Sequence, residues 1–155
     1  MTTLEDIRSL FQSQVPQGWF EGAPTVEADD EEILCVGTLP PGESVDGFRE
    51  RTRAERMAIA GEVEARFRRK VSWGVERDGA TTLFTTLNTP VMTRLRLPER
   101  SVLDTLVEAG VARSRSEALA WCVKLVGRHQ AEWIEDLREA LKGVKHARAG
   151  GPTLI

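Results

Sequence analysis

The chain has 155 residues, of which 41% are hydrophobic and 29% are charged, a composition that excludes a disordered protein. Its formal net charge of −3 does not by itself favour nucleic acid as a partner, and no run of residues is apolar enough to span a membrane. The first residues lack the basic flank and apolar run of a signal peptide, so we expect a cytoplasmic protein.

The charge is distributed unevenly along the chain. Residues 1–34 contain one arginine and eight carboxylates, a net charge of −7, whereas residues 91–116 contain five arginines and three carboxylates, a net charge of +2. The local field, more than the total charge, decides whether a surface attracts phosphate. The basic segment is therefore the candidate for contact with an anionic partner.

Cysteine and histidine form no pattern typical of a metal site. Cys35 and Cys122 each lie in an apolar run without CxxC spacing, and His129 and His146 lie near the end of the chain. We expect both cysteines to be small core residues, with a disulfide between them as the alternative that a reducing compartment disfavours. No metal or cofactor is predicted.

Residues 1–88 are predicted to form a small α+β domain. The expected elements are a helix at Thr3–Gln12, strands at Thr25–Ala28 and Ile33–Leu39, a helix from Ser44 to Arg68, and a hairpin of Val71–Arg77 and Thr81–Leu87. Asp78-Gly79 supplies the positive φ angles of a tight hairpin turn. The order predicts a helix packed on a small antiparallel sheet. No residue indicates the role of this domain, and sensing of a small molecule is only one hypothesis for it.

The helix from Ser44 to Arg68 carries many charges on its polar face. One interpretation is a solvated face with weak ion pairs at helical spacing. The other is a second phosphate-contacting surface, whose most suggestive part is the uncompensated end of the helix at Arg66, Arg68, Arg69 and Lys70. Cations are also favoured at a helix C-terminus for structural reasons alone, so both interpretations stay open.

Residues 89–127 begin with a strand of alternating character. In Val91–Leu97, Met92, Arg94 and Arg96 point to one side, and Val91, Thr93, Leu95 and Leu97 point to the other. A single short strand is an unprotected edge, so we expect it to pair with the same strand of a second copy.

Two helices are predicted after this strand. The first spans Glu99–Ala109 and ends at Gly110, and the second opens at Ser114 and Glu117, which have the Ser-x-x-Glu spacing of a capping box. The residues around this opening, Arg113, Ser114, Arg115 and Ser116, combine free amide groups, the positive helix end and cationic side chains. Such a helix opening can bind an anion.

The order of these pieces resembles the MetJ/Arc-type ribbon-helix-helix family of DNA-binding proteins. The resemblance covers about 39 of the 155 residues, from Asn88 to Val126. It implies a homodimer, joined through strand 91–97, that acts as a bacterial-type transcriptional regulator on double-stranded DNA. Arg94 and Arg96 would contact bases in the major groove, Met92 would be an unusual third position, and the opening of the second helix would contact phosphate.

Residues 128–155 are predicted to form an amphipathic helix from Gln130 to Lys142, followed by a flexible tail. Its apolar residues, Trp133, Ile134, Leu137 and Leu141, either pack on the rest of the protein or dock on another protein. The second case would make the chain an antitoxin-like or co-regulatory interaction module with little or no DNA affinity. Catalysis is not predicted, because no phosphate loop, activated nucleophile or metal cluster is present in the sequence.

Overall fold

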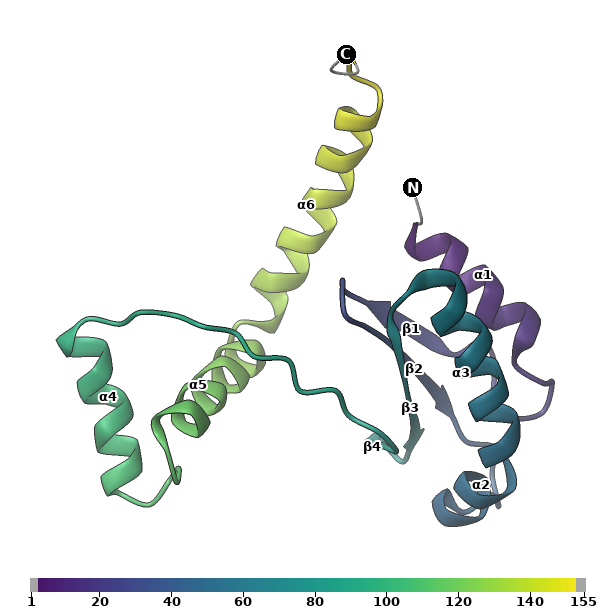
Figure 1. Ribbon diagram of the computed structural model, residues 1–155, viewed down its shortest axis with the longest axis horizontal. Helices are drawn as coiled ribbons and strands as arrows, with labels where there is room; N and C mark the ends of the chain where they lie inside the picture. The colour runs from purple at the N-terminus through teal and green to yellow at the C-terminus, as the bar shows by residue number, and fades with distance from the viewer. Residues whose placement is uncertain (1–2, 153–155) are drawn as a thin grey trace. The chain divides into compact units, whose positions relative to one another are not determined.

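The computed structural model describes residues 3–152 and divides the chain into two compact units, residues 1–91 and 92–155 (Figure 1). Six helices and four strands lie within the described residues, so the protein is α+β as predicted. Residues 1, 2 and 153–155, the last three of which end the predicted flexible tail, lie outside the described residues. No helix in the described range is both long and apolar enough to cross a membrane.

The first unit contains a four-stranded sheet in the order β1-β2-β3-β4. Its elements are α1 (Leu4–Gln14), β1 (Thr25–Ala28), β2 (Glu32–Thr38), α2 (Val45–Arg51), α3 (Arg53–Phe67), β3 (Lys70–Arg77) and β4 (Ala80–Leu83). Both predicted hairpins are present, since β1–β2 and β3–β4 are antiparallel. The prediction of a wholly antiparallel sheet is wrong, because β2 and β3 pair in parallel from Glu32–Lys70 to Thr38–Glu76. The crossover through α2 and α3 returns the chain in the same direction, as a parallel pair requires.

Local side-chain chemistry explains where several elements begin. At the start of α1, Asp6 N–H donates to Thr3 Oγ1 at 3.2 Å, and Thr3 N–H donates to Asp6 Oδ2 at 2.8 Å, which completes a capping box. Between β1 and β2, Asp29 Oδ1 accepts from the amides of Glu31 and Glu32 at 2.9 and 2.8 Å. In a turn of this kind, the side chain of the first residue holds the backbone by accepting hydrogen bonds from the amides that follow it.

The predicted helix from Ser44 to Arg68 is in fact two helices. It is interrupted at Thr52, whose backbone has φ −98° and ψ 0° and which ends α2 and precedes α3. The Thr52 hydroxyl donates to Phe48 O at 2.7 Å and accepts from Arg56 Nε at 3.0 Å. Threonine that bonds back to the preceding turn in this way bends helices, which gives the physical reason for the break.

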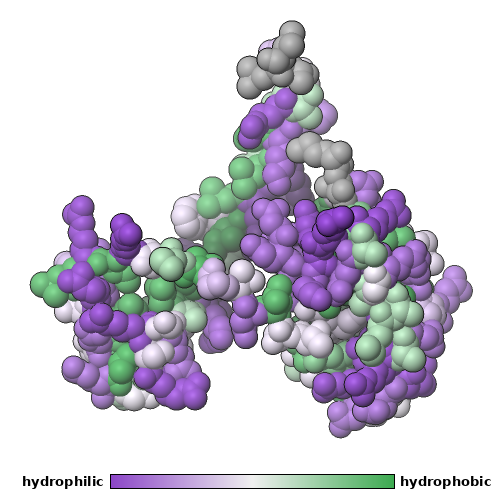
Figure 2. All heavy atoms as spheres, viewed as in Figure 1, coloured by the Kyte–Doolittle hydropathy of each residue, from purple (hydrophilic) through white to green (hydrophobic). Residues whose placement is uncertain are grey.

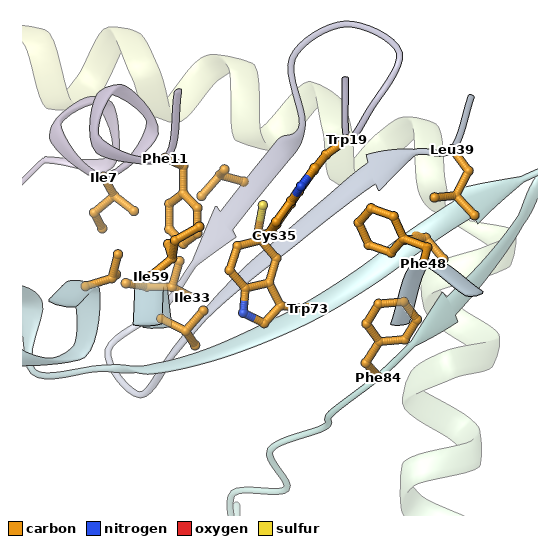
Figure 3. Packing of buried hydrophobic residues seen from close by; sticks show 14 residues of the cluster. Ile7, Phe11, Trp19, Ile33, Cys35, Leu39, Phe48, Ile59, Trp73 and Phe84 are labelled. Atoms are coloured by element: carbon orange, nitrogen blue, oxygen red, sulfur yellow. The ribbon is translucent and has the colours of Figure 1, made fainter. Parts of the chain in front are cut away.

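The core of the first unit lies between the helices and the sheet, where α1 and α3 contact β1 and β3 (Figure 1). Figure 3 shows aromatic rings from different elements packed together at its centre. The rings of Phe11 and Trp73 meet edge to face with centroids 5.6 Å apart, as do those of Trp19 and Phe48. Cys35 is buried among them, as predicted.

The second unit contains three helices, α4 (Leu97–Glu108), α5 (Arg115–His129) and α6 (Ala131–Ala149). All three were predicted, but α4 begins two residues earlier than Glu99, and α6 continues well beyond Lys142. α4 and α5 pack around the buried side chains of Leu103, Ala112 and Ala118. Cys122 is half-buried against this cluster, and neither cysteine forms a disulfide within the described residues.

Candidate nucleic-acid interface

The predicted strand 91–97 is not a strand in the structure. Residues 84–96 belong to no helix or strand, and Leu97 is already the first residue of α4. Val91, Met92 and Leu97 are 88%, 95% and 68% exposed. On the apolar side predicted for the strand, Val91, Thr93 and Leu97 are therefore exposed and Leu95 is half-buried, because no part of residues 3–152 pairs with this segment as a strand.

Leu95 fixes the end of this segment to the second unit. Its side chain is half-buried and packs against the cluster of Leu103, Ala112 and Ala118. Its carbonyl oxygen accepts from Arg100 Nη1 at 2.6 Å, so the backbone is bonded to α4 as well. The segment therefore approaches α4 in a defined register, which sets the positions of the residues on either side of Leu95.

Arg94 and Arg96, the two residues predicted to contact bases, flank this anchor. Both are exposed, and within residues 3–152 neither guanidinium forms an ion pair or hydrogen bond. The Arg96 carbonyl accepts from Arg100 N–H at 3.0 Å as the cap of α4, which orders the backbone while the side chain points to solvent. Two ordered positions thus present unpaired guanidinium groups, each a rigid fork of donors suited to guanine or phosphate.

The residues predicted to contact phosphate, Arg113, Ser114, Arg115 and Ser116, lie together at the start of α5. Ser114 Oγ accepts from Glu117 N–H at 3.2 Å and caps the helix. The capping box is not formed as predicted, because Glu117 accepts from the amide of Arg113 at 2.6 Å and not from that of Ser114. The same carboxylate also binds the Arg113 guanidinium at 3.1–3.3 Å.

Arg115 is held in a second ion pair. Its Nε and Nη2 donate to the two carboxylate oxygens of Asp104 on α4 at 2.7 and 2.9 Å. This bidentate bond raises the pKa of Arg115 and lowers the pKa of Asp104, and the bonds to Arg113 likewise lower the pKa of Glu117. Both arginines are thus charged but locally neutralised, which departs from the cationic opening predicted from the sequence.

What remains available for an anion at this helix end is the backbone. Within the part of the chain that the structure describes, the amides of Arg115 and Ser116 have no hydrogen-bond acceptor. Two free amides at the positive end of a 15-residue helix can still bind a phosphate oxygen. The sequence did not reveal Asp104 as a partner of Arg115, because the two are distant in the chain and meet only when α4 packs on α5.

The basic end of α3 has fewer cations without a carboxylate partner than its sequence indicated. Lys70 Nζ lies 3.5 Å from a carboxylate oxygen of Glu64, and Arg69 Nη2 lies 3.9 Å from one of Asp30. The description of this end as uncompensated is therefore wrong for two of its four cations, because the chain folds carboxylates from α3 and the β1–β2 turn next to them.

The second unit exposes much of its apolar surface. Only Leu103, Ala112 and Ala118 are buried hydrophobic residues within its described part, and α6 buries none. Figure 2 shows hydrophobic residues exposed along α6. Beyond Leu97, the large exposed hydrophobic residues of this unit are Val102, Val111, Trp121, Val123, Leu125, Val126, Trp133, Leu137, Leu141 and Val144. Exposed apolar surface of this extent is typical of interaction sites.

Two family models match the chain, one in each unit. The model described as "Rv1265-like protein, N-terminal domain" matches residues 5–83, and the model described as "Mb1296 C-terminal domain" matches residues 96–148. The chain belongs to the Rv1265-like family. Neither description mentions a ribbon-helix-helix fold, so that resemblance depends on the residues described above.

The Rv1265-like relatives include proteins of Mycobacterium tuberculosis and Mycobacterium bovis, named as uncharacterized proteins Rv1265 and Mb1296. Each is 54% identical to the chain over 156 residues, which cover 93% of this chain and 69% of the relative. No solved structure matches the chain. The family assignment therefore carries no activity with it, and the function is argued from the residues themselves.

Proposed function

We propose that the chain forms a homodimer that binds double-stranded DNA with sequence specificity and regulates transcription. The observation that carries the proposal is the pair of exposed, unpaired guanidinium groups of Arg94 and Arg96 on an extended segment fixed at Leu95. In the dimer, residues 91–97 of two chains would pair as a two-stranded ribbon. Such a ribbon fits the DNA major groove, which is wide enough to admit two strands.

The alternation of the segment supports this arrangement. With Leu95 directed at the hydrophobic cluster, the period of two in a strand directs Arg94 and Arg96 away from it. A guanidinium donates two parallel hydrogen bonds to guanine O6 and N7, a contact that contributes roughly 1–3 kcal/mol of discrimination between bases. Met92, at 95% exposed, occupies the third outward position and suits contact with a thymine methyl group.

Dimerisation accounts for the exposed apolar surface of the second unit. We expect a second copy of the chain to cover this surface, since an unpaired strand gains backbone hydrogen bonds by pairing with the same strand of another copy. Burying Val91 and Leu97 at this pairing, and parts of α4 and α5 beside it, would add the core that three buried residues alone do not provide.

Selection of bound sequences from a random duplex pool, followed by titration with the selected site, tests the proposal. We expect Arg94→Ala with Arg96→Ala to weaken specific binding by about 1,000-fold, since the dimer would lose four base contacts of roughly 1 kcal/mol or more each. The matched control removes two arginines from α6, Arg138→Ala with Arg148→Ala, and should leave the sequence preference unchanged.

Two results would refute the DNA-binding proposal. One is the absence of binding even at low salt, where counterion release makes every phosphate contact strongest. The other is an equal loss of affinity in the Arg94/Arg96 variant and in the α6 control, which would show that only total charge matters. Sedimentation equilibrium tests the dimer separately, and a monomer at micromolar concentration would contradict the paired ribbon.

A second candidate function is protein binding through α6. The observation in its favour is that this 19-residue helix buries none of its residues and exposes a stripe of Trp133, Leu137, Leu141 and Val144 at helical spacing. Substituting glutamate for Trp133 and Leu137 should abolish capture of a partner without changing DNA affinity. If these changes instead turn a dimer into a monomer, the stripe is a contact between copies of the chain.

A further inference from the structure

Arg56 is buried without a carboxylate partner. Its exposed fraction is 7%, whereas the sequence pattern placed it on the charged polar face of the helix predicted from Ser44 to Arg68. Its Nε donates to Thr52 Oγ1 at 3.0 Å, and its Nη2 donates to Arg49 O at 2.8 Å. No carboxylate oxygen in residues 3–152 lies within 4 Å of it. A charge removed from water without a countercharge is costly, so such a residue indicates a site for an anion.

A neighbouring aromatic ring holds this guanidinium and a second one in place. The buried ring of Phe84 has the Arg56 Cζ 4.8 Å from its centroid and the Arg49 Cζ 5.5 Å from it. Both distances are within the range of cation–π attraction. Two like charges are thus kept near one ring, and the hydrogen bonds of Arg56 fix the orientation of its guanidinium before any ligand arrives, which lowers the entropic cost of binding.

These side chains line an open pocket of about 470 Å³, a volume within the range of small-molecule sites. The pocket lies between the α2–α3 junction and the end of β4, and its charged lining residues are Arg49, Arg53, Arg56, Asp46 and Glu50. Arg49 and Arg53 also have no ion pair within the described residues. All three arginines are therefore free of direct contact with the two carboxylates. Burial, and then the nearness of Arg49 and Arg53, lower the pKa of Arg56, while Glu50 acts in the opposite direction.

We propose that this pocket binds a small phosphorylated compound, whose phosphate oxygens accept hydrogen bonds from Arg49, Arg53 and Arg56. The charged residues of the lining have a net charge of +1, which a phosphate group more than offsets, and guanidinium forks match the geometry of phosphate. A continuous DNA backbone would bring further phosphates against Asp46 and Glu50 in the pocket lining, which favours a compact ligand with one phosphate group.

Titration calorimetry on the full chain, without DNA, tests the proposal with ribose 5-phosphate, inorganic phosphate and ribose as probes. We expect saturable binding of ribose 5-phosphate, weaker binding of inorganic phosphate and none of ribose. Arg49→Gln with Arg53→Gln should weaken ribose 5-phosphate binding by about tenfold or more, because charged hydrogen bonds are lost. Both side chains are exposed, so the fold should survive, as circular dichroism can verify.

The matched control is Arg51→Gln, which lies on α2 with Arg49. Arg51 lies outside the pocket lining and pairs with Glu43 at 3.3 Å, so its loss should change affinity by less than about twofold. The proposal is overturned if no phosphorylated probe binds saturably at millimolar concentration, or if Arg51→Gln weakens binding as much as the double variant. It is also overturned if, in a separate titration with duplex DNA, the double variant loses affinity for DNA while its affinity for ribose 5-phosphate is unchanged, which would make the surface a nucleic-acid contact. Because the titration contains no DNA, its result is independent of the function proposed above.

Discussion

Replacing Thr52 by valine removes one hydroxyl group from the junction between α2 and α3 and leaves the side-chain volume nearly unchanged. Thr52 is fully buried, and its hydroxyl is both a donor to Phe48 O and the acceptor for Arg56 Nε. Phe48 O keeps the amide of Thr52 at 3.0 Å as a partner, so the main loss falls on Arg56. A buried, charged donor left without its acceptor should make Thr52→Val cost about 2–3 kcal/mol.

Thr52→Ser makes the complementary change, because it keeps the hydroxyl and removes one methyl group. Loss of a buried methyl group costs about 1 kcal/mol. The hydrogen-bond argument therefore predicts that valine is the more damaging replacement, whereas an argument from packing alone predicts that serine is. The order of the two variants decides between these explanations.

Urea unfolding followed by tryptophan fluorescence measures the difference. Trp19 and Trp73 report on the first unit once Trp121 and Trp133 are replaced by phenylalanine in every variant. For a slope of about 1.5 kcal/mol per M, the midpoint should fall by about 1.5 M for Thr52→Val and by about 0.7 M for Thr52→Ser. A valine variant that is as stable as the serine variant, or more stable, would refute the role given to the hydroxyl.

Three further predictions follow from burial and ion pairing. Phe48→Ala should destabilise the first unit by about 3–5 kcal/mol in the same unfolding assay, because it removes a fully buried ring. The Asp104–Arg115 pair lowers the pKa of Asp104 below its ordinary value of 3.8. The stabilisation by this ion pair should therefore be complete near neutral pH and be lost as the pH falls below 3.8. Comparing the unfolding free energy of the protein with that of Asp104→Asn from pH 7 to pH 2 checks this. Burial raises the pKa of Cys35 to about 12, so iodoacetamide at pH 8 should alkylate Cys122 in the native protein and Cys35 only in urea, as mass spectrometry can show.

Elements specified by neighbouring residues could be predicted from the sequence. The β3–β4 turn is an example, since Asp78 and Gly79 both have the positive φ angles, 51° and 76°, that the dipeptide indicated. The parallel pairing of β2 with β3 could not be predicted in this way, because it depends on a crossover and not on any local pattern. The break at Thr52 was missed because helical periodicity continues across it, and only the hydroxyl's bond to the preceding turn marks it.

The candidate sites divide in the same manner. The exposure of Arg94 and Arg96 was predicted from the sequence, but alternation is not its reason, because Val91, Thr93 and Leu97 on the predicted inner side are exposed as well. The neutralisation of Arg115 depends on a carboxylate from another helix, which spacing along the chain does not reveal. The burial of Arg56 on the polar face of the predicted helix was missed for a related reason, since its guanidinium packs on Phe84, a residue beyond the crossover.

The parallel pairing of β2 with β3 has a consequence for how the first unit is made. On the ribosome, β1 and β2 emerge as a hairpin whose apolar residues, including Ile33 and Cys35, have no sheet neighbour on the β2 side until residues 70–77 follow. Contacts between segments this distant close slowly, and an apolar strand edge that waits for its partner is prone to pair with another chain. The hairpin of β3 and β4 thus completes the sheet late in synthesis, and a chain that stops before it leaves an aggregation-prone edge uncovered.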